Sequence, residues 1–223
     1  MNTVKRIKIP FIEGLEQLSF EELDLALEKA GSKFPVCENN WPAAFPYGPD
    51  CNGVIARSKD YLVLAYHVRG LDIRGVELED NGNTWEDSCC EFFVQVPGAP
   101  GYFNFESNPA GRLTAAFGPD RNERKALSAE DLGKIVRITS VEGLPAVTEP
   151  LDYAGGLWNW RVMLVIPFEV IGVDPDSLPE KLLGNFYKCG DLTAHPHYVT
   201  WSPVGTPGPD FHRPEFFGEL LLD

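Results

Sequence analysis

A chain of 223 residues is long enough for one large all-β domain or two small ones, and a single domain of this size needs no disulfide or metal to bury a sizeable core. Its 33 acidic residues against 19 basic ones give a net charge of −14. This charge argues against nucleic acid and anionic membranes as partners, because their phosphates would repel such a surface. No stretch approaches the roughly 20 apolar residues of a membrane-spanning helix.

The cysteines and the first 15 residues give information about the cellular compartment of the protein. The five cysteines are an odd number, Cys89 and Cys90 are adjacent, and no metal-ligand spacing such as CxxC occurs. We therefore expect free thiols in a reducing compartment. The first 15 residues lack the apolar core and the cleavage site of a signal peptide. The protein is thus expected to be cytoplasmic, or periplasmic or secreted if a leader has been removed from the sequence.

The first 53 residues predict one strand, one helix and a long irregular segment. Residues 4–9 alternate loosely and predict an edge strand that ends at Pro10. Ser19 and Glu22 have the spacing of a capping box, and the apolar residues that follow predict a helix ending at Gly31, which covers an edge or end of a sheet. Residues 34–53 are rich in Pro, Gly, Asn and aromatic residues and predict irregular chain packed on the domain.

Short apolar runs separated by Pro and Gly dominate the rest of the chain. They predict strands at residues 54–56, 61–69, 84–96, 102–108, 113–117, 135–141, 158–166, 182–187, 198–201 and 216–222, with a helical turn at 128–132. This pattern predicts an all-β fold, an antiparallel β-sandwich of the jelly-roll or immunoglobulin type with one N-terminal helix. We expect a single domain over residues 1–223, in which residues 1–40 form an N-terminal strand-and-helix extension.

The stretch at residues 84–96, TWEDSCCEFFVQV, is the strongest candidate for a site. In an extended strand, Cys89, Glu91 and Phe93 face one side and Cys90 and Phe92 face the other. Glu91 is thus a carboxylate on rigid backbone, and Trp85 precedes it as a flat apolar neighbour. This combination is typical of a site for a polar, flat-faced ligand, although a plain core strand would show the same alternation.

Signatures of serine hydrolases, P-loop proteins, dinucleotide-binding proteins and zinc proteases are missing. His195, His197 and His212 lie close together in the sequence, and Cys189 and Asp191 are near enough to keep a metal site under consideration. Loop histidines beside proline are common without a metal, so we assign no metal ligands.

Several segments occur in the order seen in carbohydrate-binding modules of family 9: WEDSCCEFF, YFNFESN, GNFYKCGD, VTWSPV and PDFHRPEFFGEL. From about Trp41 to the C-terminus, the chain resembles the stand-alone family 9-like proteins of gut Bacteroidetes. The resemblance implies a non-catalytic β-sandwich that holds the terminal unit of a sugar chain between two aromatic planes. It also implies a mono- or oligosaccharide ligand and a role in carbohydrate metabolism and polysaccharide catabolism.

When the family's site residues are carried over position by position, the resemblance implies a sugar site made of Trp85, Glu91, Asn104, Glu106, Lys188 and Phe211. Trp85 and Phe211 match the aromatic planes, and Phe211 stands where the family more often has Trp. Asn104, Glu106 and Lys188 depart from the family in residue type, so the sugar is not defined. Family members carry structural calcium, and the resemblance allows a calcium ion here without assigning its ligands.

Two alternatives stay open. A glycoside hydrolase would use Glu91 and Glu106, which requires two carboxyl groups about 5–5.5 Å or 6.5–9.5 Å apart, one of them with a raised pKa. A haem or redox module is the second alternative, because related sandwiches carry haem. Met1, Met163 and the histidines near the C-terminus are poor candidates for its axial ligands.

Overall fold

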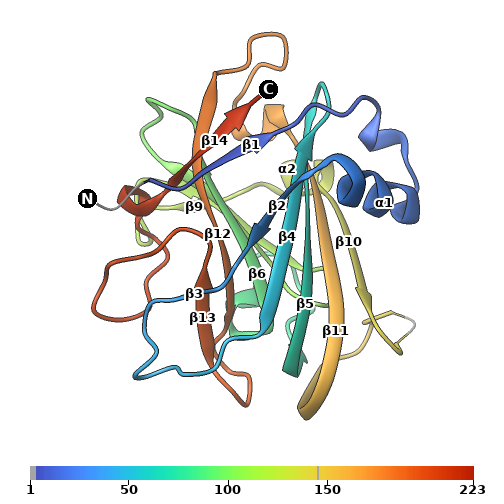
Figure 1. The fold of residues 1–223 in the computed structure, drawn as a ribbon, viewed down its shortest axis with the longest axis vertical. Helices are drawn as coiled ribbons and strands as arrows, with labels where there is room; N and C mark the ends of the chain where they lie inside the picture. Colours follow the sequence, from blue (N-terminus) through green and yellow to red (C-terminus); the bar gives the residue numbers. More distant parts are fainter. Residues whose placement is uncertain (1–3, 145) are drawn as a thin grey trace.

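Two β-sheets pack face to face in the computed structural model, which describes residues 4–144 and 146–223 (Figure 1). Within these residues the larger sheet has nine strands. Its main path runs β1 (Arg6–Ile9), β14 (Gly218–Leu222), β12 (Lys181–Gly190), β6 (Cys89–Gln95), β7 (Tyr102–Ser107), β8 (Leu113–Gly118) and β9 (Lys125–Ala126). Strand β12 also pairs with β13 (His197–Thr200), which pairs with β3 (Glu38–Asn39).

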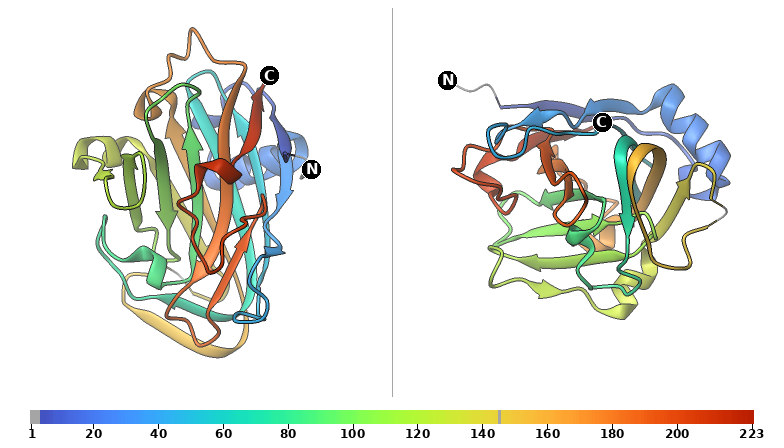
Figure 2. Two further views of the ribbon diagram at one scale, coloured as in Figure 1. Left: turned by 90° about the vertical axis from the view of Figure 1, so that its left-hand side faces the viewer. Right: turned by 90° about the horizontal axis from the view of Figure 1, so that it is seen from below.

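The smaller sheet has five strands in the order β10 (Val136–Val141), β11 (Leu151–Pro167), β5 (Tyr61–Gly75), β4 (Asp50–Arg57) and β2 (Ser32–Pro35). All of its pairings are antiparallel. In the larger sheet β1 pairs parallel with β14, so the first described strand closes one edge beside the last. The predicted all-β sandwich is confirmed, and the two sheets appear as separate layers when the molecule is seen from below (Figure 2).

The main core lies between the sheets and follows from the period-2 alternation of the strands. Phe92 of β6 and Phe186 of β12 face inward and stack with ring centroids 5.2 Å apart. Phe34 of β2 stacks on Phe186 at 3.8 Å. A Cβ at Gly53 would lie 2.0 Å from the Phe34 ring, so only glycine leaves room for this stack.

Helix α1 (Phe20–Ala30) begins with the predicted capping box, in which Ser19 and Glu22 satisfy each other's backbone N–H groups. Its apolar face buries Leu23 and Leu27 against the outer face of β4, β5 and β11. The helix therefore covers a sheet face, and the prediction that it covers an edge or end was wrong. Strand β5 presents apolar residues on both faces, one to the main core and one to this helix.

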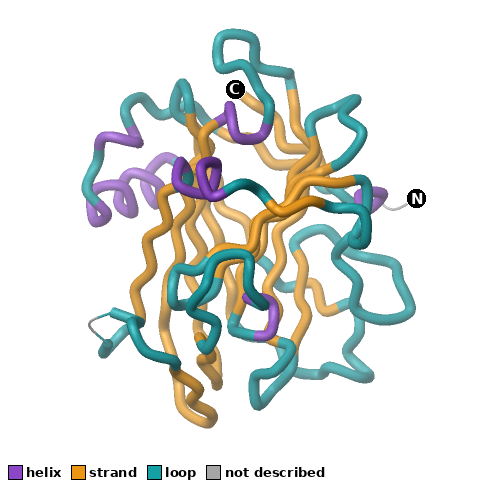
Figure 3. The backbone as a smooth tube through the Cα atoms, turned by 180° about the vertical axis from the view of Figure 1, so that it is seen from behind, coloured by secondary structure: helices purple, strands orange, loops and turns teal. Residues whose placement is uncertain are grey.

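The prediction of irregular chain at residues 34–53 was wrong in part, because β2 and β3 lie there and β4 already begins at Asp50. Pro35 is tolerated because β2 is an edge strand. The predicted helical turn is helix α2 (Ala129–Lys134), capped by Ser128. Helices are short and peripheral throughout the described chain (Figure 3). No helix among the described residues is both long and apolar enough to cross a membrane.

The outer face of the larger sheet carries a second aromatic cluster. It is built on the strand residues Phe93, Tyr102 and Tyr187, which face away from the main core. Loop residues Trp41 and Phe211 pack over them. Long connections after β3 and β13 supply these loop residues, so the outer face is covered in part and left open in part.

Candidate functional site

A pocket of about 390 Å³ opens on this outer face of the larger sheet. Its floor comes from three adjacent strands, with Glu91 on β6, Glu106 on β7 and Cys189 on β12. Glu91 lies directly opposite Glu106 in the β6–β7 pairing. The walls come from loops and from residues at strand ends: Phe45, Trp85, Arg121, Arg124, Asp191, Tyr198, Pro209, Asp210, Phe211 and His212. The volume lies in the range of small-ligand pockets.

Trp85 reaches the pocket from a single turn of 3-10 helix, η2 (Thr84–Glu86), just before β6. The Trp85 carbonyl accepts a hydrogen bond from the Asp191 N–H (3.3 Å), and the Cys189 sulfur at the end of β12 lies 3.5 Å from the same carbonyl oxygen. The Thr84 hydroxyl donates to the Glu106 carbonyl of β7 (3.1 Å). The indole is thus attached to a turn that is bonded to both neighbouring strands.

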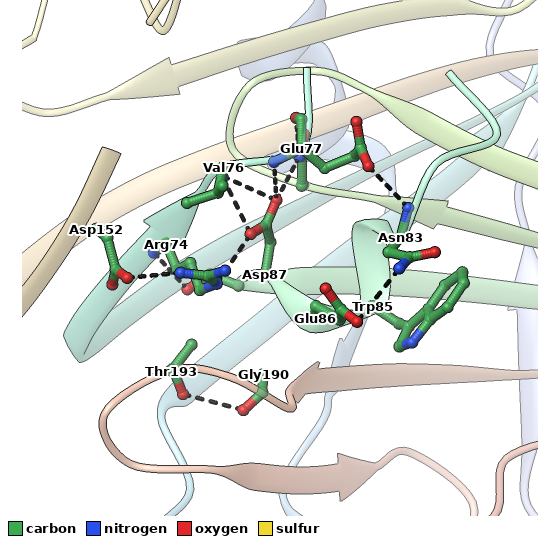
Figure 4. Close-up of polar contacts among 12 residues, drawn as sticks. Arg74, Val76, Glu77, Asn83, Trp85, Glu86, Asp87, Asp152, Gly190 and Thr193 are labelled. Atoms are coloured by element: carbon green, nitrogen blue, oxygen red, sulfur yellow. Dashed lines mark hydrogen bonds and ion pairs between the residues drawn. The ribbon is translucent and has the colours of Figure 1, made fainter. Parts of the chain in front are cut away.

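Asp87 anchors this turn from the other side (Figure 4). Its buried carboxylate accepts hydrogen bonds from the N–H groups of Val76 (3.1 Å) and Glu77 (3.0 Å). The Asn108 amide donates to it at 2.8 Å, and Arg74 Nε lies 3.3 Å away. Because three hydrogen-bond donors and one arginine converge on this carboxylate, the turn that carries Trp85 is held in a single place.

Phe211 forms another part of the pocket wall. Its ring stacks on Tyr187 of β12 with centroids 4.2 Å apart and an interplanar angle of 10°. The Tyr187 hydroxyl donates to the Phe211 carbonyl (3.1 Å), so ring and backbone are held by the same residue. Phe211 is only 6% exposed and one of its faces is covered, so it offers the pocket less surface than a free aromatic plane would.

The acidic floor is partly neutralised. Burial and the neighbouring Glu106 raise the pKa of Glu91 well above its usual value, and burial raises the pKa of Glu106 against the opposing effect of Arg124. Arg124 Nη1 lies 3.1 Å from Glu106 Oε1. The Glu91 side chain accepts a hydrogen bond from the Cys189 thiol, at 3.0 Å. The floor therefore combines a carboxylate paired with arginine and a carboxylate beside a thiol.

His212 lies at the rim between these groups. Its Nδ1 is 2.8 Å from the Tyr102 hydroxyl and its Nε2 is 3.3 Å from Arg124. Burial, together with Arg124 and Arg121, lowers the pKa of His212 to about 3. The ring is therefore neutral at physiological pH, and its two nitrogens hold the Tyr102 hydroxyl and Arg124 in place without adding charge to the pocket.

Four of the six residues implied by the resemblance line the same pocket: Trp85, Glu91, Glu106 and Phe211. Asn104 is fully buried beside them, where its amide donates to Glu106 Oε1 (2.9 Å). Lys188 is not brought to the pocket. It points to the opposite face of β12, where its Nζ lies 2.8 Å from His197 Nε2 and 5.8 Å from the Trp160 ring centroid.

The histidines do not converge on a metal site. His195 Nδ1 is 2.8 Å from Asp72, His197 contacts Lys188, and His212 contacts Tyr102. Among the described residues, one group of three potential metal-ligating side chains lies close together, namely Cys89, Glu91 and Cys189. Thiols are poor ligands for calcium, so this group does not fit the calcium ion allowed by the resemblance.

The methionines considered as axial ligands do not support the haem alternative within the part of the chain that the structure describes. Met163 is buried under helix α1, in the small core on the other side of the smaller sheet. Met1 lies outside the described residues.

Sequence reasoning did not assign several pocket residues, above all Phe45, Arg124 and Tyr198. Arg124 belongs to a charged loop with no local pattern, and its partner Glu106 is 18 residues away. Phe45 packs edge-on against Tyr198, with centroids 4.7 Å apart. The aromatic content of residues 34–53 was the only available signal for Phe45.

A β-sandwich with an aromatic-walled polar pocket on the outer face of one sheet defines a ligand-binding module. The sequence model for carbohydrate-binding family 9 matches residues 21–222, and the chain belongs to this family. Among curated proteins, none shows a significant match to the chain.

Solved structures agree with the fold. The chain is similar to a protein of Bacteroides uniformis described as a candidate carbohydrate-binding protein, with a TM-score of 0.89, 32% identity and coverage of 99% of this chain and 100% of that one. It is also similar to a family 9 module of Caldicellulosiruptor kristjanssonii in complex with glucose (TM-score 0.59, 11% identity, coverage 98% and 96%). A cellotriose complex from the same organism gives a TM-score of 0.54 at 12% identity, with coverage of 98% and 93%. The resemblance seen in the sequence is thereby confirmed.

Proposed function

We propose that this protein binds a terminal sugar unit in the pocket between Trp85 and Phe211, without cleaving it. Membership of carbohydrate-binding family 9 supports a sugar as the ligand, and structures of that family have been solved with glucose and with cellotriose. The observation that carries the proposal is the meeting of aromatic walls with a polar floor, formed by Glu91 and Glu106 and flanked by Arg124, in one open pocket.

The chemistry of the pocket fits a pyranose ring. Trp85, Phe45 and Tyr198 offer aromatic surface to the C–H faces of a sugar, and the carboxylates and Arg124 offer acceptors and donors to its hydroxyls. A hydrogen bond to a charged group contributes about 1.5–3 kcal/mol, and an aromatic contact about 0.5–1.5 kcal/mol beyond its area. After the costs of ordering, we expect a Kd of roughly micromolar to millimolar.

A glycoside hydrolase is the second candidate, because the opposed Glu91 and Glu106 interact and both have raised pKa values. Hydrolysis needs two carboxyl groups that flank the scissile bond. Here both side chains project from neighbouring strands of one floor, which favours hydroxyl binding from a single side. Binding is therefore the function that the geometry supports better.

Isothermal titration calorimetry against glucose, cellotriose and a panel of other mono- and oligosaccharides tests the proposal. We expect saturable binding of at least one sugar, and a loss of about tenfold or more in affinity for Trp85→Ala, since removing a ring removes about 1.4 kcal/mol or more of contact. Trp158→Ala is the matched control, because Trp158 is a half-buried tryptophan that stacks on Tyr153 and does not line the pocket.

The absence of heat for every sugar, with Trp85→Ala behaving like the wild type, would reject the proposal. Release of reducing sugar that disappears in Glu91→Gln would establish the hydrolase instead. The two candidates are thus separated by product formation, because a binding protein returns its ligand unchanged.

A further inference from the structure

We propose that Cys89, Glu91 and Cys189 form a zinc site at the floor of the pocket, with one coordination position open toward the pocket. The three side chains come from two adjacent strands. Cys89 and Glu91 are two residues apart on β6 and share its outer face, and Cys189 of β12 lies directly opposite Cys89. The strand pairing alone therefore brings the three groups together.

The spacing of the ligand atoms suits a small cation. The two sulfur atoms and a carboxylate oxygen all lie within 4.8 Å of one another. In a tetrahedral zinc site with Zn–S bonds of about 2.3 Å and Zn–O bonds of about 2.0–2.2 Å, neighbouring ligand atoms are about 3.5–3.8 Å apart. Zinc binding would bring the ligand atoms to these separations by rotation of the three side chains.

Among the described residues, Glu91 forms no ion pair that would compete with a metal ion. Glu91 is 3% exposed, and a buried carboxylate normally has a charged partner or several donors. Arg124 pairs with Glu106 rather than with Glu91, and the Cys189 thiol donates to the Glu91 side chain. A thiol is a weak donor. A zinc ion would replace this weak contact with a full positive charge.

The chemical types of the three ligand atoms determine which metal ion the site prefers. Two thiolates favour zinc over calcium and magnesium, and a carboxylate oxygen is a common third zinc ligand. Cys89 is fully buried, whereas Glu91 and Cys189 line the pocket, so an ion would enter from the pocket and keep its fourth position on that side. Binding would release the thiol proton of each cysteine to the solvent.

Lys188 supplies a compensating charge from behind the site. Its ammonium group donates to the Cys189 carbonyl (2.5 Å) on the inner side of the sheet. Two thiolates and one carboxylate carry one negative charge more than a zinc ion neutralises. The buried ammonium group lowers the cost of that excess negative charge in the interior.

The test is zinc binding to the full chain, kept reduced and free of sugar, measured by competition with a metallochromic indicator. We expect a single zinc ion per chain, and a loss of affinity of about 100-fold or more in Cys89→Ser and in Cys189→Ser, because removing a ligand costs at least as much as removing its supporting partner. Cys90→Ala is the matched control, since Cys90 is the adjacent buried thiol on the opposite face of β6 and should leave zinc affinity unchanged.

Cobalt added to the wild type provides a readout that does not depend on any variant folding. Thiolate-to-cobalt charge-transfer absorption with intense tetrahedral d–d bands is expected, and circular dichroism shows whether each variant is folded. Zinc affinity that is equal in the wild type, Cys89→Ser and Cys189→Ser, or cobalt spectra without thiolate bands, would overturn the proposal. Sugar binding is measured separately, so either proposal can fail without the other.

Discussion

Phe211 stacks on Tyr187 with ring centroids 4.2 Å apart and nearly parallel planes. Tyr187 belongs to β12 and is fully buried, whereas Phe211 belongs to the connection that follows β13. A loop residue is thereby held by a strand residue, and the pocket wall acquires the rigidity of the sheet. This matters for binding because a pre-ordered wall lowers the entropy that a ligand must offset.

Phe211→Leu is expected to weaken sugar binding by about 2- to 10-fold, the loss of one aromatic contact of about 0.5–1.5 kcal/mol. Titration calorimetry with the best sugar of the panel measures the change. Phe217→Leu is the control, because Phe217 belongs to the same aromatic cluster, packs edge-on against Tyr102 and does not line the pocket. Equal affinities for the two variants would contradict the role given to Phe211.

Lys188→Met should leave sugar affinity within about twofold of the wild type, because the ammonium group lies on the far side of the sheet from the pocket. Arg124→Met is its counterpart. Arg124 lines the pocket and pairs with Glu106, so its loss should weaken sugar binding at least tenfold, the cost of one charged hydrogen bond. A tenfold loss in Lys188→Met, measured in the same titration, would contradict the placement.

Asp87→Asn is expected to destabilise the protein by about 3 kcal/mol or more, because an amide would place a donor among three donors and leave Arg74 without its buried charge partner. Urea unfolding at neutral pH measures this loss. Asp152→Asn is the control, since Asp152 pairs with the same arginine from an exposed position. Similar unfolding midpoints for the two variants would show that the Asp87 network is not important for stability.

The lowered pKa of His212 predicts that the stability of the folded protein depends on pH. Its pKa is about 3 in the folded protein against 6.5 ordinarily, so between these values the unfolded chain binds a proton that the folded chain does not. The contribution of His212 is therefore complete above about pH 6.5 and is lost as the pH falls toward 3, with a slope approaching about 1.4 kcal/mol per pH unit. The charged and titratable groups around the His212 ring are Arg124, Arg121, Asp120 and Tyr102.

His212→Gln keeps a polar side chain and removes this titration. The difference in unfolding free energy between wild type and variant, measured from pH 7 to pH 4, should shift in favour of the variant as the pH falls. Both proteins contain the carboxylates that titrate in the same pH range, so their contribution cancels in the difference between the two unfolding free energies. Parallel curves for the two proteins would contradict a buried neutral His212.

The sequence alone was sufficient to predict the β-sandwich, the capped helix α1 and which residues lie on each face of β6. These features depend on local patterns: a period of two places Glu91 opposite to Phe92, and the Ser19–Glu22 spacing sets a helix start. Family motifs in the sequence likewise identified the family, because they are spread over most of the chain. The sugar-binding roles of the six implied residues stay a prediction.

Only the tertiary structure decided which side chains share the pocket. Lys188 and Cys189 are neighbours in sequence, yet they face opposite sides of β12, and strand register determines which of them meets Glu91. Arg124 and Phe45 reach the pocket from loops whose paths are set by packing on the sheet. Loop paths and strand register depend on contacts between residues far apart in the chain, and no local pattern encodes them.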